Sequence, residues 1–263
     1  MDKTKISTSN KLTDKIYGSL SIILFFLAWE IGPRVGLLKS TLVSPPSEVL
    51  LYYITLINDD HLFTHISVSL LRSVSGFLLA ILIGTPLGFL LGGWFKTFEK
   101  IVEPVLKFLG QFNPFSLFPI FILILGIGEI SKITMIFWVC LWPIIFNTTT
   151  GVREVDPLLI KSGRAMGLGR VSLLIKIVFP ASLAYIFNGF KLASGTAFFM
   201  LIAAEMIGAS QGLGWLTLNA QVNFQIPKLY AGTVLISALG LLISHLFSLW
   251  EKKTILWKDT PVL

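Results

Sequence analysis

The chain has 263 residues, of which 54% are hydrophobic and only 13% charged, and its mean hydropathy is +0.80. This leaves too little polar surface to cover a soluble globule, which excludes a water-soluble enzyme or binding module. The composition places the chain in a bilayer, so the net charge of +7 has to be interpreted by where the cations lie.

A membrane-spanning helix needs about 20 mostly apolar residues. Six stretches meet this need, namely Ile16–Ile31, Ser73–Gly92, Val105–Leu125, Ile130–Phe146, Ala184–Ile207 and Leu229–Leu249. We therefore predict an all-α integral membrane protein with about six transmembrane helices. Residues 1–64 hold the N-terminal tail, the first span and an outer-surface segment, 65–250 the membrane core, and 251–263 a C-terminal tail.

The first span follows four lysines, as a signal peptide would, but Trp29 and Glu30 end its apolar run without the small residues of a cleavage site. We interpret it as an anchor. If the N-terminus is cytoplasmic, 14 of the 21 cations lie on the inside and four on the outside, while Arg72, Lys107 and Lys191 lie near span ends. This positive-inside pattern predicts that both termini are cytoplasmic, and it implies no nucleic acid.

The outer segment between the first two spans contains Ser44-Pro45-Pro46-Ser47-Glu48, which is typical of a helix start. His61 and His65 lie four residues apart, but they have no catalytic glutamate and no third ligand, so we assign no metal site. The single Cys140 cannot form a disulfide within one chain.

The second predicted span carries small residues at every fourth position. Such a ridge lets a second helix approach closely in lipid, where hydrophobic burial cannot drive helices together. The ridge consists of Gly76, Ala80, Gly84, Gly88 and Gly92, and Gly189, Ala193 and Ala197 repeat it on the fifth span.

The third predicted span contains Asn113, Pro114 and Pro119, which should break its helix. Broken backbone at membrane depth is tolerated where it is buried in protein or lines a water-filled cavity. A wall of a translocation pathway and a packed proline kink both stay open. Gly126 to Glu129 is expected to form the next tight turn.

A carboxylate within an apolar run is by default a candidate functional group, and Glu205 lies near the outer end of the fifth span. Glu205 could belong to the pathway, or it could have a structural role in which it reaches lipid headgroups or caps a loop. Both interpretations stay open. The sequence offers no partner for Glu205 at motif spacing.

The most informative polar stretch runs from Lys161 to Pro180. Its mixed polar and apolar positions on both sides of Gly167 predict two short helices joined at a bend. The spacing Gly167, nine residues, Ile177, one residue, Phe179-Pro180 resembles the cytoplasmic EAA loop of permease subunits of bacterial ATP-binding-cassette (ABC) importers. An ordinary basic loop held near anionic lipid is the alternative.

The resemblance covers the chain from about His65 onward and implies the MetI-like ABC importer permease fold. It also implies a bacterial inner-membrane location, a coupling loop at 153–180 and a separate ATPase that docks on it. Further segments, among them Gly126–Lys132 and Asn147–Val152, are similar to the branch that includes nitrate, sulfonate, taurine and bicarbonate permeases. That architecture also carries thiamine precursors.

The chain departs from the family pattern at its start, where Lys161-Ser162-Gly163 stands in place of Glu-Ala-Ala. We expect Ser162 and Gly163 to permit close docking, Ile177 and Phe179 to anchor the ATPase, and Arg164 and Arg170 to lie at the rim of the contact. The outer cations Arg72 and Lys132 are candidates for attracting an anionic substrate.

The sequence contains no phosphate-binding loop of the form GxxxxGK[ST], so ATP and magnesium belong to the partner ATPase and no cofactor is assigned to this chain. No catalytic residue is assigned either. The expected partners are the ATPase, an extracytoplasmic solute-binding protein and a second permease, identical or related. An ion-coupled carrier using Glu205 and Arg72, and an intramembrane enzyme, are the alternatives from other classes.

Overall fold

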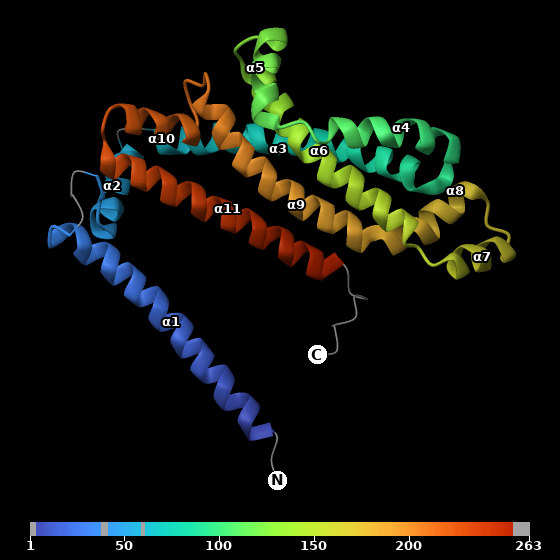
Figure 1. The fold of residues 1–263 in the computed structure, drawn as a ribbon, viewed down its shortest axis with the longest axis horizontal. Coiled ribbons are helices and arrows are strands. Elements are labelled where there is room, and N and C mark those ends of the chain that lie inside the picture. Colours follow the sequence, from blue (N-terminus) through green and yellow to red (C-terminus); the bar gives the residue numbers. More distant parts are fainter. Residues whose placement is uncertain (1–3, 38–41, 59–60, 255–263) are drawn as a thin grey trace. The chain divides into compact units, whose positions relative to one another are not determined.

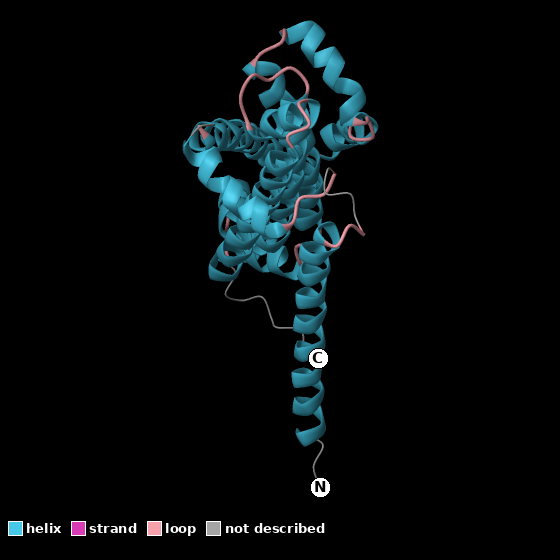
Figure 2. Cartoon of the chain, turned by 90° about the vertical axis from the view of Figure 1, so that its left-hand side faces the viewer, coloured by secondary structure: helices cyan, strands magenta, loops and turns pink. Residues whose placement is uncertain are grey.

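The computed structural model describes residues 4–37, 42–58 and 61–254, and every regular element within them is a helix (Figure 1, Figure 2). The helices are α1 (Thr4–Arg34), α2 (Pro46–Asn58), α3 (Leu62–Phe89), α4 (Lys96–Leu109), α5 (Pro114–Leu125), α6 (Glu129–Arg153), α7 (Pro157–Ala165), α8 (Arg170–Leu173), α9 (Phe179–Met206), α10 (Leu213–Val222) and α11 (Ile226–Thr254), with π-helical turns η1 (Leu90–Trp94) and η2 (Leu174–Val178). The predicted all-α class is confirmed.

Four continuous helical stretches of the described chain are long and apolar enough to cross a membrane. They are Leu62–Gly93, Glu129–Arg153, Arg170–Met206 and Ile226–Glu251. Thr97–Leu109 and Pro114–Leu125 together make a fifth candidate, bent by 95°. The first predicted span, Ile16–Ile31, lies in α1, where the described side chains begin at Tyr17, and it stays a prediction.

Two predicted span boundaries were wrong. The helix of the second span begins at Leu62 instead of Ser73, because its polar residues find partners inside the protein and the helix continues through them. The fifth span does not begin at Ala184, since η2 joins α8 to α9 without interruption and the helical stretch starts at Arg170. Arg72 and Lys191 therefore lie within helical spans instead of near their ends.

The predicted break in the third span is confirmed. Helix α4 ends at Leu109, and α5 starts at Pro114 after a short turn (Figure 1). Asn113 has an extended backbone, and its side-chain oxygen accepts a hydrogen bond from the Phe115 amide at 2.9 Å. This satisfies one of the free N–H groups at the new helix start. Pro119 lies inside α5, and the helix continues through it.

The described residues form two compact units. One comprises the chain up to Phe63 together with Leu216–Leu235, and the other comprises Thr64–Trp215 and the residues from Ile236 onward. In the first unit, Glu30 accepts hydrogen bonds from the Ser47 amide at 3.1 Å and the Ser47 hydroxyl at 2.8 Å. The end of α1 thereby holds the start of α2, at the predicted helix start near Pro46.

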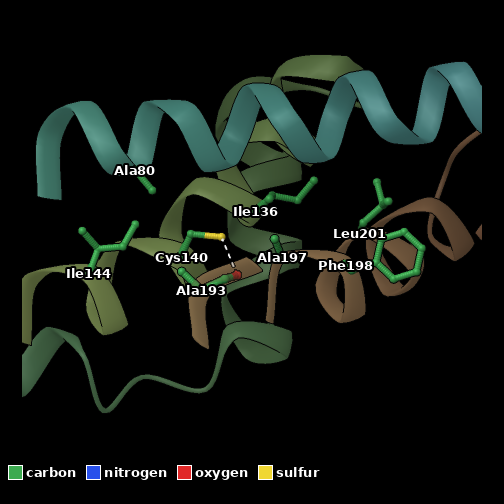
Figure 3. Close-up of a cluster of buried hydrophobic side chains, with 8 residues drawn as sticks. All are labelled: Ala80, Ile136, Cys140, Ile144, Ala193, Ala197, Phe198 and Leu201. Atoms are coloured by element: carbon green, nitrogen blue, oxygen red, sulfur yellow. Dashed lines mark hydrogen bonds between the residues drawn. The ribbon is translucent and has the colours of Figure 1, made fainter. Parts of the chain in front are cut away.

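The core of the second unit lies where α3 and α9 pack against α6. The buried side chains of its central cluster include Ala80, Ile136, Cys140, Ala193 and Leu201 (Figure 3). The Cys140 thiol donates to the Ala193 carbonyl at 3.4 Å. The small side chains of Cys140 and Ala193 let the backbones of α6 and α9 come this close.

The small residues of α3, and Gly92 in the π-helical turn η1 that follows it, face α6 in a constant register. A Cβ atom added at Gly76 would lie 2.8 Å from Ile136, at Gly84 3.0 Å from Ile144, at Gly88 2.5 Å from Thr148 and at Gly92 2.3 Å from Val152. Ala80 is completely buried in the same interface. On α9, a Cβ at Gly189 would meet Asn147 at 2.9 Å.

Candidate functional site

The segment from Arg153 to Pro180, here called the coupling segment, consists of α7, α8 and η2. Asp156 starts α7 by accepting a hydrogen bond from the Leu158 amide at 2.8 Å. Gly167, with φ +80°, ends it. The Gly167 amide donates to the Arg164 carbonyl at 3.0 Å and the Leu168 amide to the Gly163 carbonyl at 3.1 Å. This pair of bonds is the Schellman arrangement, which needs a residue tolerant of positive φ.

The coupling segment has its own apolar core, which joins it to the end of α6 and to α3. Val152, Val155, Leu173 and Val178 are buried together, and Phe89 of α3 packs against them. Loops rarely bury so many apolar side chains. The segment is therefore a folded part of the protein that moves with the helices to which it is packed.

The structure differs from our expectation for two of the predicted contact residues. Gly163 is buried, and a Cβ there would clash with the Ile177 side chain, so their close approach joins α7 to η2 within this chain. Ile177 is half-buried in the same core. Gly163 and Ile177 therefore support the segment from inside. Phe179 stacks on Phe89, with ring centroids 5.8 Å apart, and remains 41% exposed.

The outer face of the coupling segment combines apolar and cationic side chains. Leu158, Met166 and Val171 are 65%, 76% and 71% exposed, so the described part of the chain leaves most of their surface uncovered. Four of the predicted polar residues share this exposure, namely Lys161, Ser162, Arg164 and Arg170. Pro180, half-buried, lies in the first turn of α9.

Arg153 joins the start of the coupling segment to α4. Its Nη2 donates to Glu99 Oε1 at 2.6 Å and to Glu103 Oε2 at 2.7 Å. The same nitrogen reaches the Leu91 carbonyl of η1 at 3.4 Å. Because two carboxylates bind the planar guanidinium, they fix the orientation of the Arg153 side chain relative to α4, which a single ion pair would not do.

Glu205 is completely buried in a polar cluster that the sequence did not reveal. Its Oε1 accepts from Arg72 Nη1 at 2.8 Å and from the Ser69 hydroxyl at 2.7 Å, and its Oε2 accepts from the Gly214 amide at 2.8 Å. Arg72 also binds Glu129 through two nitrogens. The carboxylate thus holds the start of α10, which is the loop-capping role considered above.

The expectation that Arg72 and Lys132 attract an anion was wrong. Both side chains are buried, and Glu129 accepts from each of them, with the Lys132 ammonium 3.5 Å from its Oε1. Charges already neutralised at short range exert little attraction on a distant ion. His65 lies beside the cluster, accepts from the Gly212 amide at 2.9 Å and stacks on Trp215. In the described part of the chain, no three metal-ligating side chains gather.

The remaining pathway candidates lie on α5, which turns away from α4 (Figure 1). Asn113 and Pro119 are exposed, as are the apolar side chains Leu123 and Ile124 near the other end of the helix. The exposed side of α9 runs through Tyr185, Asn188 and Phe199. Sequence reasoning overlooked Lys191 on this helix, because the shorter predicted span put it near an end.

Apolar helices in series, one broken span and a folded loop segment at the start of α9 define the class: a multi-pass helical transport protein. A model of the family described as "Binding-protein-dependent transport system inner membrane component" matches residues 84–255. The chain belongs to this family. It is a membrane-spanning permease subunit of an ABC importer. In this family, a partner subunit hydrolyses the ATP.

Known proteins resemble the chain over most of its length. The putative aliphatic sulfonates transport permease protein SsuC of Bacillus subtilis is 30% identical over 243 residues, 92% of this chain and 88% of the relative. The bicarbonate transport system permease protein CmpB of a Synechocystis species is 30% identical over 85% of this chain and 83% of the relative.

A solved structure of the inward-facing MetNI methionine ABC transporter has the same fold. Its TM-score is 0.66 at 19% identity, and the match covers 73% of this chain and 95% of that one. The predicted MetI-like fold is confirmed. Family membership favours neither the ion-coupled carrier nor the intramembrane enzyme.

Proposed function

We propose that this permease imports a small anion of the sulfonate, taurine, nitrate or bicarbonate class. Relatives named for aliphatic sulfonates and for bicarbonate support this class, because both substrates are small anions. The substrate is delivered by an extracytoplasmic solute-binding protein, and energy comes from a separate ATPase that binds ATP and magnesium. The chain spans the bacterial inner membrane with both termini in the cytoplasm, as the distribution of its cations indicates.

The observation that carries the coupling role is the exposed apolar face of a segment that is packed firmly from behind. Leu158, Met166 and Val171 offer uncovered apolar surface, and Lys161, Arg164 and Arg170 surround it with positive charge. Apolar anchors with a charged rim are the usual composition of a protein interface. We therefore assign ATPase contact to this face and internal support to Gly163 and Ile177, while Phe179, which is 41% exposed, stays a candidate for ATPase contact.

Two permease copies, identical or related, enclose the pathway in this proposal, each holding one ATPase subunit. The broken span α4–α5 and the exposed side of α9 line it, and the exposed apolar residues of α5 meet the second copy. Closure of the ATPase pair rocks the two coupling segments and exposes the pathway to alternate sides of the membrane.

Recruitment of the ATPase tests the docking face. Leu158→Asp combined with Met166→Asp should abolish co-purification of the ATPase while leaving the permease folded, since both side chains are exposed and outside the predicted spans. Ser210→Asp, an equally exposed change on the α9–α10 loop, is the matched control. Unchanged recruitment by the double variant would count against the docking face.

Uptake tests the substrate class. The complete transporter in proteoliposomes, supplied with binding protein and internal ATP, should import an alkanesulfonate, taurine, nitrate or bicarbonate, and vanadate should stop the import. If the transporter imports a thiamine precursor and none of these anions, the proposed substrate class is wrong and the thiamine precursor takes its place.

A further inference from the structure

A lysine lies near the middle of α9 on the exposed side of that helix. Lys191 is nearly central in α9, and its neighbours on that helix meet the middle of α6: a Cβ at Gly189 would lie 3.1 Å from the Pro143 carbonyl, and Ala193 accepts from Cys140. Cys140 and Pro143 flank the midpoint of the span Glu129–Arg153. Lys191 is thus separated from both ends of the span by several helical turns.

The Lys191 side chain is exposed, and no carboxylate of the described chain lies within ion-pair distance of it. Arg72 and Glu205 show how this protein treats its other charges inside spans, by pairing and burying them. A cation at the centre of the bilayer is costly against lipid, by about 3 kcal/mol or more. Such a side chain therefore faces a water-filled space or a bound anion.

The surface around Lys191 is polar and open. Asn188 lies three residues before it on the same side of α9 and donates to Asn147 Oδ1 of α6 at 2.9 Å, while Asn147 donates to the Pro143 carbonyl. Each primary amide has two N–H donors, so each keeps one for a ligand. Gly195, one turn after Lys191, has no atom within 4 Å of an added Cβ, which leaves room beside the ammonium.

We propose that Lys191, with the Asn147–Asn188 amide pair, forms the anion contact of the translocation pathway at mid-membrane. This inference rests on the proposed anion import and assigns the residue that recognises the charge. The ammonium supplies the attraction, and the amides supply hydrogen bonds to the oxygens that sulfonate and bicarbonate share. Because no carboxylate competes for the ammonium, the anion can both bind there and leave.

The test uses the complete transporter with permease, ATPase and binding protein in proteoliposomes, and labelled ethanesulfonate and bicarbonate as probes. Loss of a charge-assisted hydrogen bond predicts that Lys191→Met lowers uptake about 10- to 100-fold, while Lys191→Arg retains most of it. Lys253→Met, an exposed lysine near the end of α11, is the matched control and should import at the wild-type rate.

A chemical rescue separates charge from shape. In a Cys140→Ala background, Lys191→Cys should regain uptake after reaction with aminoethyl methanethiosulfonate, which restores an ammonium. Reaction with the neutral methyl reagent or the anionic sulfonatoethyl reagent should leave uptake low.

The outcomes are distinguishable. A wild type that imports neither probe, and neither taurine nor nitrate in the uptake assay described above, overturns the proposed substrate class and this role with it. A wild type that imports one of them, together with Lys191→Met within twofold of its rate, overturns only the role of Lys191. Loss of permease pairing or of ATPase recruitment in Lys191→Met, without rescue by the aminoethyl reagent, would instead assign Lys191 to a contact between subunits and overturn the anion contact.

Discussion

Single residues show how the protein accommodates charge inside apolar helices. Arg72 and Glu205 come from helices far apart in sequence and form an ion pair at 2.8 Å. The Ser69 hydroxyl and the Gly214 amide donate the remaining hydrogen bonds to the Glu205 carboxylate. Burial of a charge is tolerated when it is paired and fully hydrogen-bonded. The cluster therefore joins α3, α9 and the start of α10 through bonds whose loss cannot be compensated by water.

Glu205→Ala should destabilise the protein strongly. The variant removes the partner of a buried guanidinium and the acceptor for Gly214, and breaking a buried pair costs about 3 to 5 kcal/mol. Thermal unfolding of the detergent-purified permease measures the change. Glu154→Ala, which removes an exposed carboxylate, is the control and should unfold like the wild type. Equal melting temperatures for the two variants would contradict the role assigned to the cluster.

The partner of Glu205 could not have been found from the sequence. Arg72 and Glu205 are 133 residues apart, and their contact depends on how α3 and α9 both pack on α6. Periodicity describes the faces of one helix and says nothing about which side chain of another helix lies opposite. The only sequence signal was the cost of a carboxylate in an apolar run, which marks a special residue without naming its role.

Among the elements, α3 and α6 approach each other closely through small residues on α3. The spacing of small residues on α3 indicated a face for close approach, and α6 lies against that face. The sequence could not specify the facing residues Ile136, Ile144, Thr148 and Val152, because register depends on the second helix. Dispersion between closely approaching backbones holds such pairs in lipid.

Gly92→Ala should weaken this helix pair, because the new methyl group would lie 2.3 Å from the Val152 side chain. Overpacking of this kind costs about 1 to 3 kcal/mol, so we expect a lower melting temperature and a lower yield of folded permease. Gly128→Ala is the control, since its extended backbone suits any residue and nothing lies near an added Cβ. A Gly92→Ala variant that unfolds at the same temperature as Gly128→Ala would argue against this contact.

The coupling segment was predicted as two helices with a bend at Gly167, and that description is confirmed. Which apolar side chains face inward was not predictable. Ile177 lies within η2, a π-helical turn in which side chains do not follow the spacing of a regular α-helix. Helical periodicity presumes a regular α-helix, so it could not predict that Ile177 packs against Gly163.

At the scale of the whole molecule, the distribution of lysine and arginine predicts the side on which each turn lies. In a Cys140→Ala background, Ile127→Cys in the turn before α6 should react with a membrane-impermeant maleimide added to cells with a permeable outer membrane. Met166→Cys in the coupling segment should react only after the inner membrane is disrupted. Both side chains are highly exposed, so accessibility within the protein does not limit either reaction. The reverse pattern would invert the proposed orientation.

Hydropathy located most of the spans because lipid demands long apolar helices whatever their tertiary contacts. It failed at Ser73, where polar residues of the preceding turns are bound by the protein instead of by water, and at Ala184, where η2 continues the helix back to Arg170. Likewise, Pro114 predicted a break, but the 95° bend depends on how α5 packs against α6.

The two ion pairs of Arg153 have a consequence for how movement passes between helices. Its guanidinium holds Glu99 and Glu103 of α4 at the point where the coupling segment begins, and α4 leads directly into the bend before α5. We therefore expect a displacement of α7 to be transmitted to α4, because one guanidinium binds both carboxylates of that helix. In the proposed transport cycle, these ion pairs would connect movement of the coupling segment to movement of the broken span, without unfolding any helix between them.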